Sequence, residues 1–162
     1  ELQHSENERV FGKLFEAVYN SNLKKVLRVG ITKVLDEYEA EYSACLKVRG
    51  GTTNSIDGLI QIEKDIRDKK AAPLDFYLLL LNIIPQAIGE ATAILETEER
   101  DEMIRVYEEV DDGEFKEIIK RFEKVLRNNR VDGMKQYLAR SGEALTKLLA
   151  YLKVDARILM ME

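Results

Sequence analysis

Carboxylates are the side chains of this sequence best placed to do chemistry, and they are densest between residues 95 and 112. The segment reads LETEERDEMIRVYEEVDD and holds nine carboxylates and two arginines. Residues 98–102 within it have the pattern E-E-x-x-E, whose carboxylates can hold a metal ion if they share one helix face. Three interpretations are open: a metal site, an electrostatic docking surface, or the solvated back of a helix.

A helical wheel favours the solvated back. Stepped at about 100° per residue, Glu102 and Glu109 fall within about 40° of Glu98. The opposite arc holds the apolar residues of the segment, which are Met103, Ile104, Val106, Tyr107 and Val110. The carboxylates therefore point away from the side that the helix buries, whereas a catalytic metal needs its ligands in a sheltered cleft. We predict one helix through this segment, with an acidic outer face.

Three other carboxylates lie closer to apolar stripes. Glu41 borders the apolar face of a helix that begins near residue 23, and Glu37 lies one turn before it. Glu63 stands within the stripe of the next helix, where a leucine is expected. A short glycine loop joins the two helices, so we expect them to pack antiparallel, with Glu41 facing Glu63. Two acids that close need Mg²⁺, a base or a shared proton, and we favour an ion pair, such as that of Glu63 with Arg67 one turn on.

This arrangement resembles the all-α nucleotide pyrophosphohydrolases of the MazG type, in which acidic motifs on two adjacent helices bind Mg²⁺. The motif of that family is roughly E-x-x-E, followed on the next helix by E-x-x-D. This sequence has Glu37-x-x-x-Glu41 instead, and Glu63 is followed by Ile66 where the family has aspartate. The resemblance implies Mg²⁺-dependent nucleotide hydrolysis at Glu37, Glu41 and Glu63, in a dimer. We carry this function as the enzymatic alternative.

Histidine and cysteine each occur once, which narrows the possible chemistry. His4 stands alone, so systems built on a catalytic histidine or on Glu-x-x-His di-iron sites are not expected. Cys45 falls on an apolar stripe, where we expect a structural thiol rather than a nucleophile. One cysteine and one histidine make no zinc site. The loop GGTTNS at residues 50–55 lacks the Lys-Ser/Thr of a P-loop and follows no strand, so it indicates a helix end and a helix start.

A basic stripe provides a second alternative. Lys116, Lys120 and Arg127 are expected on the outer face of a helix, where they could contact nucleic-acid phosphates. Glu117 and Glu123 interrupt the stripe, and the whole chain carries a net charge of −5. We therefore do not favour nucleic-acid binding and expect a solvated helix face here.

Helical periodicity dominates the sequence and predicts an all-α, single-domain bundle of six to eight helices over residues 1–162. Pro73 is well placed to begin a helix, and Pro85 predicts a kink or a break. The predicted helices cover about 5–19, 23–45, 55–68, 73–84, 87–110, 115–126 and 134–152, the last continuing to 159 if Leu159 belongs to it.

Composition limits the setting of the protein. Hydrophobic residues make up 45% of the 162 residues and charged residues 34%, as in a globular helical domain. The longest unbroken apolar run, Phe76–Leu81, is far shorter than the roughly 20 residues that span a bilayer, so we predict no membrane span. No signal peptide is visible, and the single cysteine favours a reducing compartment, which we take to be the cytoplasm. The chain begins with Glu1, so we allow that it is a fragment or a processed product.

These observations predict a non-enzymatic module that binds another protein or assembles with copies of itself. The main support for this module is that no nucleophile system, zinc site or cofactor motif is recognised in the sequence. We therefore expect no cofactor, except Mg²⁺ under the enzymatic alternative. The methionines at the end of the chain, in Leu159-Met160-Met161, add weak support, because methionine suits adaptable interfaces.

Overall fold

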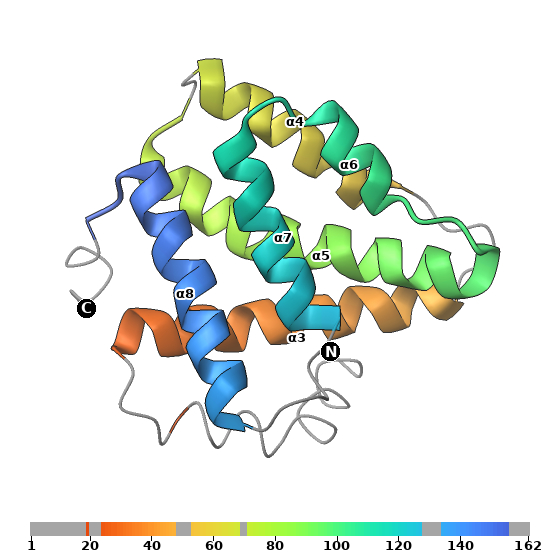
Figure 1. The fold of residues 1–162 in the computed structure, drawn as a ribbon, viewed down its shortest axis with the longest axis horizontal. Coiled ribbons are helices and arrows are strands. Elements are labelled where there is room, and N and C mark those ends of the chain that lie inside the picture. The colour runs from red at the N-terminus through yellow and green to blue at the C-terminus, as the bar shows by residue number, and fades with distance from the viewer. Residues whose placement is uncertain (1–18, 20–23, 48–52, 69–70, 128–133, 156–162) are drawn as a thin grey trace.

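The computed structural model describes residues 19, 24–47, 53–68, 71–127 and 134–155, and the regular structure in these ranges is helical. This confirms the predicted all-α bundle (Figure 1). Six helices follow one another within the described ranges: α3 (Lys25–Lys47), α4 (Asn54–Asp68), α5 (Pro73–Glu98), α6 (Met103–Glu109), α7 (Gly113–Arg127) and α8 (Met134–Leu152). Residues 5–18 of the predicted helix at 5–19, His4, the Gly50-Gly51 stop and the methionines at 160–161 lie outside the described residues. The single-domain prediction includes those residues and stays a prediction.

Helix α5 forms the centre of the bundle, because it packs against α3, α4, α7 and α8. Pro73 occupies its first turn, as predicted, where a missing backbone N–H removes no helical hydrogen bond. Among the described helices, α5 alone is long and apolar enough to cross a membrane, and 61% of its most apolar window is buried inside the structure. The apolar character of α5 is that of a core helix, and no clear membrane span is present among the described residues.

Pro85 does not break α5, which continues as one helix from Pro73 to Glu98. The predicted break is therefore wrong, and the kink stays a prediction. Proline inside a helix costs about 3 kcal/mol, because it removes a hydrogen bond and its ring crowds the preceding turn. Pro85 is itself buried, and the neighbours that pack on α5 offset this cost by holding both halves of the helix.

Helices α3 and α5 run in the same direction (Figure 1), and their backbones come close together at Gly89. A Cβ atom on Gly89 would lie 2.7 Å from the carbonyl oxygen of Tyr38 and 3.1 Å from the amide nitrogen of Tyr42. Beyond this contact, the Tyr38 hydroxyl lies 3.5 Å from Oγ1 of Thr92, and the Tyr42 hydroxyl donates to Glu96 at 2.5 Å. Glycine thus allows the two backbones to touch.

Helix α5 lies between α3 and α4 and packs against both (Figure 1). The prediction that α3 and α4 pack against each other is therefore wrong. The reason is that α5 is apolar around most of its circumference, so it can bury the apolar stripes of α3 and α4 at the same time. Each of those two helices has only one apolar stripe, and that stripe faces α5.

Helices α7 and α8 form an antiparallel hairpin that packs across α5, while α8 also contacts α3. Arg121 and Glu143 form an ion pair of 2.6 Å between the two helices, and the rings of Phe115 and Tyr151 lie 5.6 Å apart. The predicted apolar stripe of α7 is buried in full: Phe115, Ile118, Ile119, Phe122, Val125 and Leu126.

Gly89→Ala should lower the free energy of unfolding by roughly 1–3 kcal/mol, because the added methyl group meets backbone atoms that cannot rotate away. Gly113→Ala is the matched control, since nothing lies within 4 Å of a Cβ at Gly113. The control should leave stability unchanged or raise it by up to about 1 kcal/mol. Urea denaturation of both variants measures the difference, and equal stabilities would contradict the close approach of α3 and α5.

Candidate functional site

The acidic segment at 95–112 is not one helix. Helix α5 ends at Glu98, and Glu99 adopts the left-handed conformation with φ 56° and ψ 30°. Its amide donates to the carbonyl oxygen of Leu95 and closes the helix, and α6 begins only at Met103. The predicted continuous helix is therefore wrong, and the E-E-x-x-E residues are divided between a helix end, a turn and a helix start. They share no helix face that could hold a metal ion.

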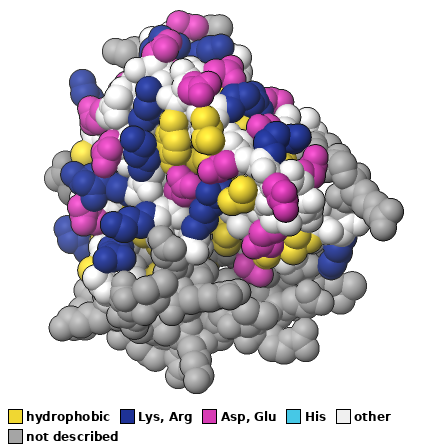
Figure 2. All heavy atoms as spheres, turned by 45° about the vertical axis from the view of Figure 1, so that its right-hand side comes forward, with side chains coloured by type: hydrophobic (Ala, Val, Ile, Leu, Met, Phe, Trp, Pro, Cys, Tyr) yellow, Lys and Arg dark blue, Asp and Glu magenta, His cyan; other side chains and the backbone are white. Residues whose placement is uncertain are grey.

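Most carboxylates of this segment have nearby partners. Glu98 pairs with Arg100 at 3.5 Å, and Glu109 pairs with Arg105 at 3.4 Å. Figure 2 brings the right-hand side of Figure 1 forward and shows basic and acidic side chains intermixed over the visible face. Met103, Val106 and Val110 are buried as predicted, whereas Ile104 is 58% exposed, which corrects its predicted inward position. Ion pairs within the segment therefore balance part of its negative charge.

Asp112 has a defined structural role as the cap of α7. Its Oδ1 accepts hydrogen bonds from the amides of Glu114 and Phe115 at 2.9 and 3.3 Å, and its Oδ2 accepts one from the Tyr151 hydroxyl at 2.7 Å. Burial acts to raise the pKa of Asp112, but these hydrogen bonds outweigh it and hold the pKa below its usual value. The ionised form is therefore the one that stabilises the fold.

Asp112→Ala should lower the free energy of unfolding by about 1 kcal/mol near neutral pH, as the loss of a helix cap does. Because the pKa of Asp112 is lower in the folded state, its carboxylate contributes to the free energy of unfolding above about pH 4. This contribution is lost as the pH falls through the folded-state pKa. The difference between wild type and variant should therefore shrink in acid, which urea denaturation at several pH values measures. A difference independent of pH would contradict this assignment, and Tyr151→Phe should show a smaller effect of the same sign.

Glu63 and Glu37 each have a partner on their own helix. The Glu63 side chain is fully buried, pairs with Nε of Arg67 at 2.5 Å and accepts a hydrogen bond from the Asp111 amide at 3.2 Å. This confirms the ion pair expected between Glu63 and Arg67. Glu37 pairs with Lys33 at 3.3 Å. The structure therefore does not bring Glu37, Glu41 and Glu63 together on one site.

Glu41 belongs to a different cluster, which lies where α3 crosses α5. Glu41 and Cys45 stand one turn apart on α3, and Glu90 comes from α5, next to Gly89. One ligand atom from each of the three side chains lies within 4.8 Å of the other two. Within the part of the chain that the structure describes, no other group of three such side chains comes this close together.

Glu90 is a carboxylate inside the apolar core, with 1% of its surface exposed. Its Oε1 accepts a hydrogen bond of 3.2 Å from the amide of Ile56, in the first turn of α4. The positive end of the α4 dipole also favours a negative charge at this position. Glu90 was not among the predicted site residues, although it is the one charged residue between Ala87 and Leu95, which was a usable signal.

The Cys45 thiol lies 3.6 Å from Oε1 of Glu41 and is half-buried. Burial raises the pKa of Cys45 to about 12, and the charges of Glu41 and Glu90 act in the same direction. The thiol is therefore protonated at neutral pH and is a poor nucleophile, in line with the structural role expected from the sequence.

Cys45 should react with a disulfide reagent such as DTNB at least tenfold more slowly at pH 7 than a cysteine in the urea-unfolded chain, because little thiolate is present. Glu41→Gln should speed the reaction, because it removes a neighbouring negative charge. Stopped-flow absorbance measures both rates. A folded-state rate equal to the unfolded one would contradict the raised pKa.

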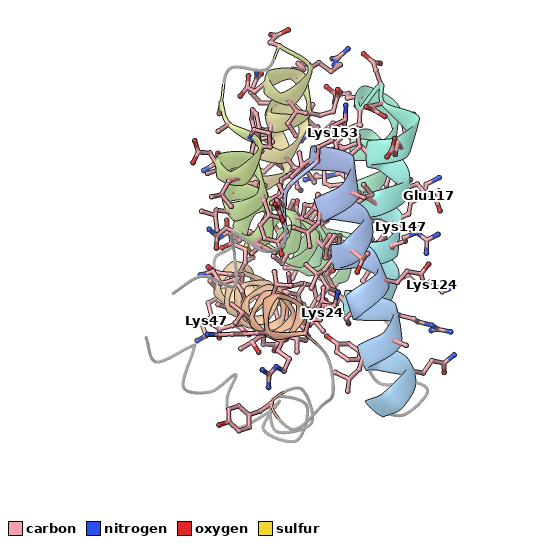
Figure 3. The ribbon with its side chains drawn as sticks, turned by 90° about the vertical axis from the view of Figure 1, so that its left-hand side faces the viewer. Lys24, Lys47, Glu117, Lys124, Lys147 and Lys153 are labelled. Atoms are coloured by element: carbon pink, nitrogen blue, oxygen red, sulfur yellow. The ribbon has the colours of Figure 1, made fainter. Side chains whose placement is uncertain are left out.

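The basic stripe of α7 differs from its prediction at Arg127. The Arg127 side chain is only 17% exposed, its Nε donates to Thr92 at 3.0 Å, and its guanidinium pairs with Glu123 at 2.6 Å. The predicted outward position of Arg127 is therefore wrong. Lys120 stacks over the Tyr107 ring, with its Nζ 5.4 Å from the ring centre. Figure 3 shows Glu117 on the same side of the molecule as Lys124 and Lys147, so this face carries both signs of charge.

Comparison of the chain with models of protein families, with curated proteins and with solved structures finds no match. The function is therefore inferred from the described side chains alone.

Proposed function

We propose that the protein is a non-enzymatic assembly module that self-associates through an apolar pair on α5. The observation that carries this proposal is the exposure of Leu78 and Leu79, which are 49% and 50% exposed on the central, most apolar helix. The residues on either side of the pair are buried in the core: Phe76, Tyr77, Leu80 and Leu81.

The leucine pair supports a weak contact rather than a permanent one. Full burial of a leucine side chain contributes about 1.5–3 kcal/mol, so the exposed half of each gives about 1 kcal/mol. A two-fold contact uses each residue twice, once in each copy. Four such contributions total about 4 kcal/mol, which only matches the low end of the entropic cost of association, about 4 kcal/mol, so the leucine pair gives at most a weak contact. We therefore expect self-association that depends on concentration.

The alternatives have weaker support. Magnesium-dependent nucleotide hydrolysis needs Glu37, Glu41 and Glu63 on one ion, and these carboxylates have separate partners. Nucleic-acid binding needs an outward basic stripe, from which Arg127 is withdrawn. The proposal requires no cofactor, and we retain the cytoplasm as the proposed location on the ground of the single cysteine.

The double variant Leu78→Lys with Leu79→Lys should abolish self-association, because two buried lysines would lose their hydration and repel their copies. Multi-angle light scattering across a concentration range up to about 1 mM measures the average mass, which should rise for the wild type and stay that of a monomer for the variant.

Val29→Lys on α3 is the matched control, because Val29 is also an exposed apolar residue, with 57% of its surface accessible. This variant should associate like the wild type. A wild-type protein that stays monomeric at every concentration would contradict the proposal. Loss of association in the Val29→Lys control as complete as in the double leucine variant would also contradict it.

A further inference from the structure

We propose that Glu41, Cys45 and Glu90 bind one divalent transition-metal ion of the zinc type, through the Cys45 sulfur and one oxygen of each glutamate. This site is independent of the proposed self-association, since its residues lie at the α3–α5 crossing and do not include Leu78 or Leu79. The sequence does not predict this metal site, because its ligands come from two helices that only the fold brings together. Neither the single cysteine nor the acidic segment indicates it.

The donor set selects the kind of metal. Mg²⁺ and Ca²⁺ bind oxygen ligands, whereas zinc and its neighbours accept sulfur together with carboxylate oxygen. Cys45 supplies the sulfur and the two glutamates supply oxygens, so a thiophilic ion uses all three side chains. Three protein ligands also leave a fourth position of a tetrahedral ion for water. The site thus differs in metal from the Mg²⁺ site that the sequence resemblance implies.

The distances require little movement. Zinc lies about 2.3 Å from sulfur and about 2.0–2.2 Å from oxygen, so two ligands of one tetrahedral ion are separated by roughly 3.3–3.8 Å. Cys45 Sγ and Oε1 of Glu41 are already 3.6 Å apart. All three ligand atoms lie within 4.8 Å of one another, so small rotations of the side chains close the site.

The fold holds the ligands in place. Glu41 and Cys45 share one helix face at a spacing of four residues, and the close approach at Gly89 fixes α5 against that face. The Cβ atom of Glu41 would itself lie 3.5 Å from a Cβ on Gly89, which shows how near α5 passes to this ligand. The Ile56 amide orients the Glu90 carboxylate, as a hydrogen bond to a metal ligand does in known sites.

Metal binding must displace the proton of the Cys45 thiol. The sulfur–hydrogen bond breaks, a sulfur–metal bond forms, and the proton leaves to solvent or buffer. One proton is released for each ion bound, so the apparent dissociation constant should fall about tenfold for each unit rise in pH while the thiol is protonated in the free protein. No oxidant or reductant takes part.

Titration of the metal-free protein with Co²⁺ tests the proposal, because Co²⁺ takes zinc sites and gives a thiolate-to-metal charge-transfer band. The band should saturate at one equivalent, disappear on addition of Zn²⁺ and persist in a hundredfold excess of Mg²⁺. The apparent dissociation constant, measured at pH 6.5, 7.5 and 8.5, should show the tenfold steps. A protein that gives no charge-transfer band overturns the proposal.

Variants separate this site from binding by the cysteine alone. Cys45→Ser should remove the band, and Glu41→Gln and Glu90→Gln should each weaken Co²⁺ binding at least tenfold. Glu37→Gln is the matched control, because Glu37 lies one turn before Glu41 and pairs with Lys33. The affinity of this variant for Co²⁺ should equal that of the wild type. Circular dichroism checks that Glu90→Gln, which alters the contact with α4, still folds. If the Glu90→Gln variant does not fold, the Glu41→Gln variant provides the test. An affinity for Co²⁺ in Glu41→Gln equal to that of the wild type would overturn the proposed site.

Discussion

The contact at Gly89 places two helix backbones closer than any side chain would allow, and the arrangement of the bundle depends on it. With α3 held against α5, the hydroxyls of Tyr38 and Tyr42 reach Thr92 and Glu96 along the same seam. The next residue of α5, Glu90, is carried into the core, where it meets the first turn of α4. One small residue therefore determines how three helices meet.

Several ion pairs among the described residues connect different helices, such as Arg105 of α6 with Asp57 of α4 and Arg121 of α7 with Glu143 of α8. Arg127 shows this best, because it joins α7 to Thr92 of α5 and also pairs with Glu123, which accepts a hydrogen bond from Tyr107 of α6. Such networks strengthen in a partly buried environment and define the relative rotation of helices more narrowly than apolar contacts do. The high charge content of the sequence is thus compatible with a specific fold.

Periodicity was enough to place α3, α4, α7 and α8 and the start of α5, because apolar stripes and the Pro73 start depend on residues close in the sequence, but it did not separate α6 from α5. It did not reveal which stripes meet, and for this reason α3 and α4 were paired with each other instead of with α5. The turn at Glu99 was missed because a glutamate in the left-handed conformation leaves no glycine or proline as a signal. For the candidate site, Glu41 and Cys45 were noted from the sequence, but Glu90 approaches them only through the tertiary fold.

The parallel pairing of α3 with α5 has a kinetic consequence. Tyr38 and Thr92 are 54 residues apart, whereas Arg121 and Glu143 of the α7–α8 hairpin are 22 apart. Closing the longer loop costs about 3.5 kcal/mol of chain entropy, against about 2.7 kcal/mol for the shorter one. We expect the hairpin to form early and the central seam to form late, near the rate-limiting step. During synthesis, α3 leaves the ribosome well before α5, so its apolar stripe stays uncovered long enough for a chaperone to bind it.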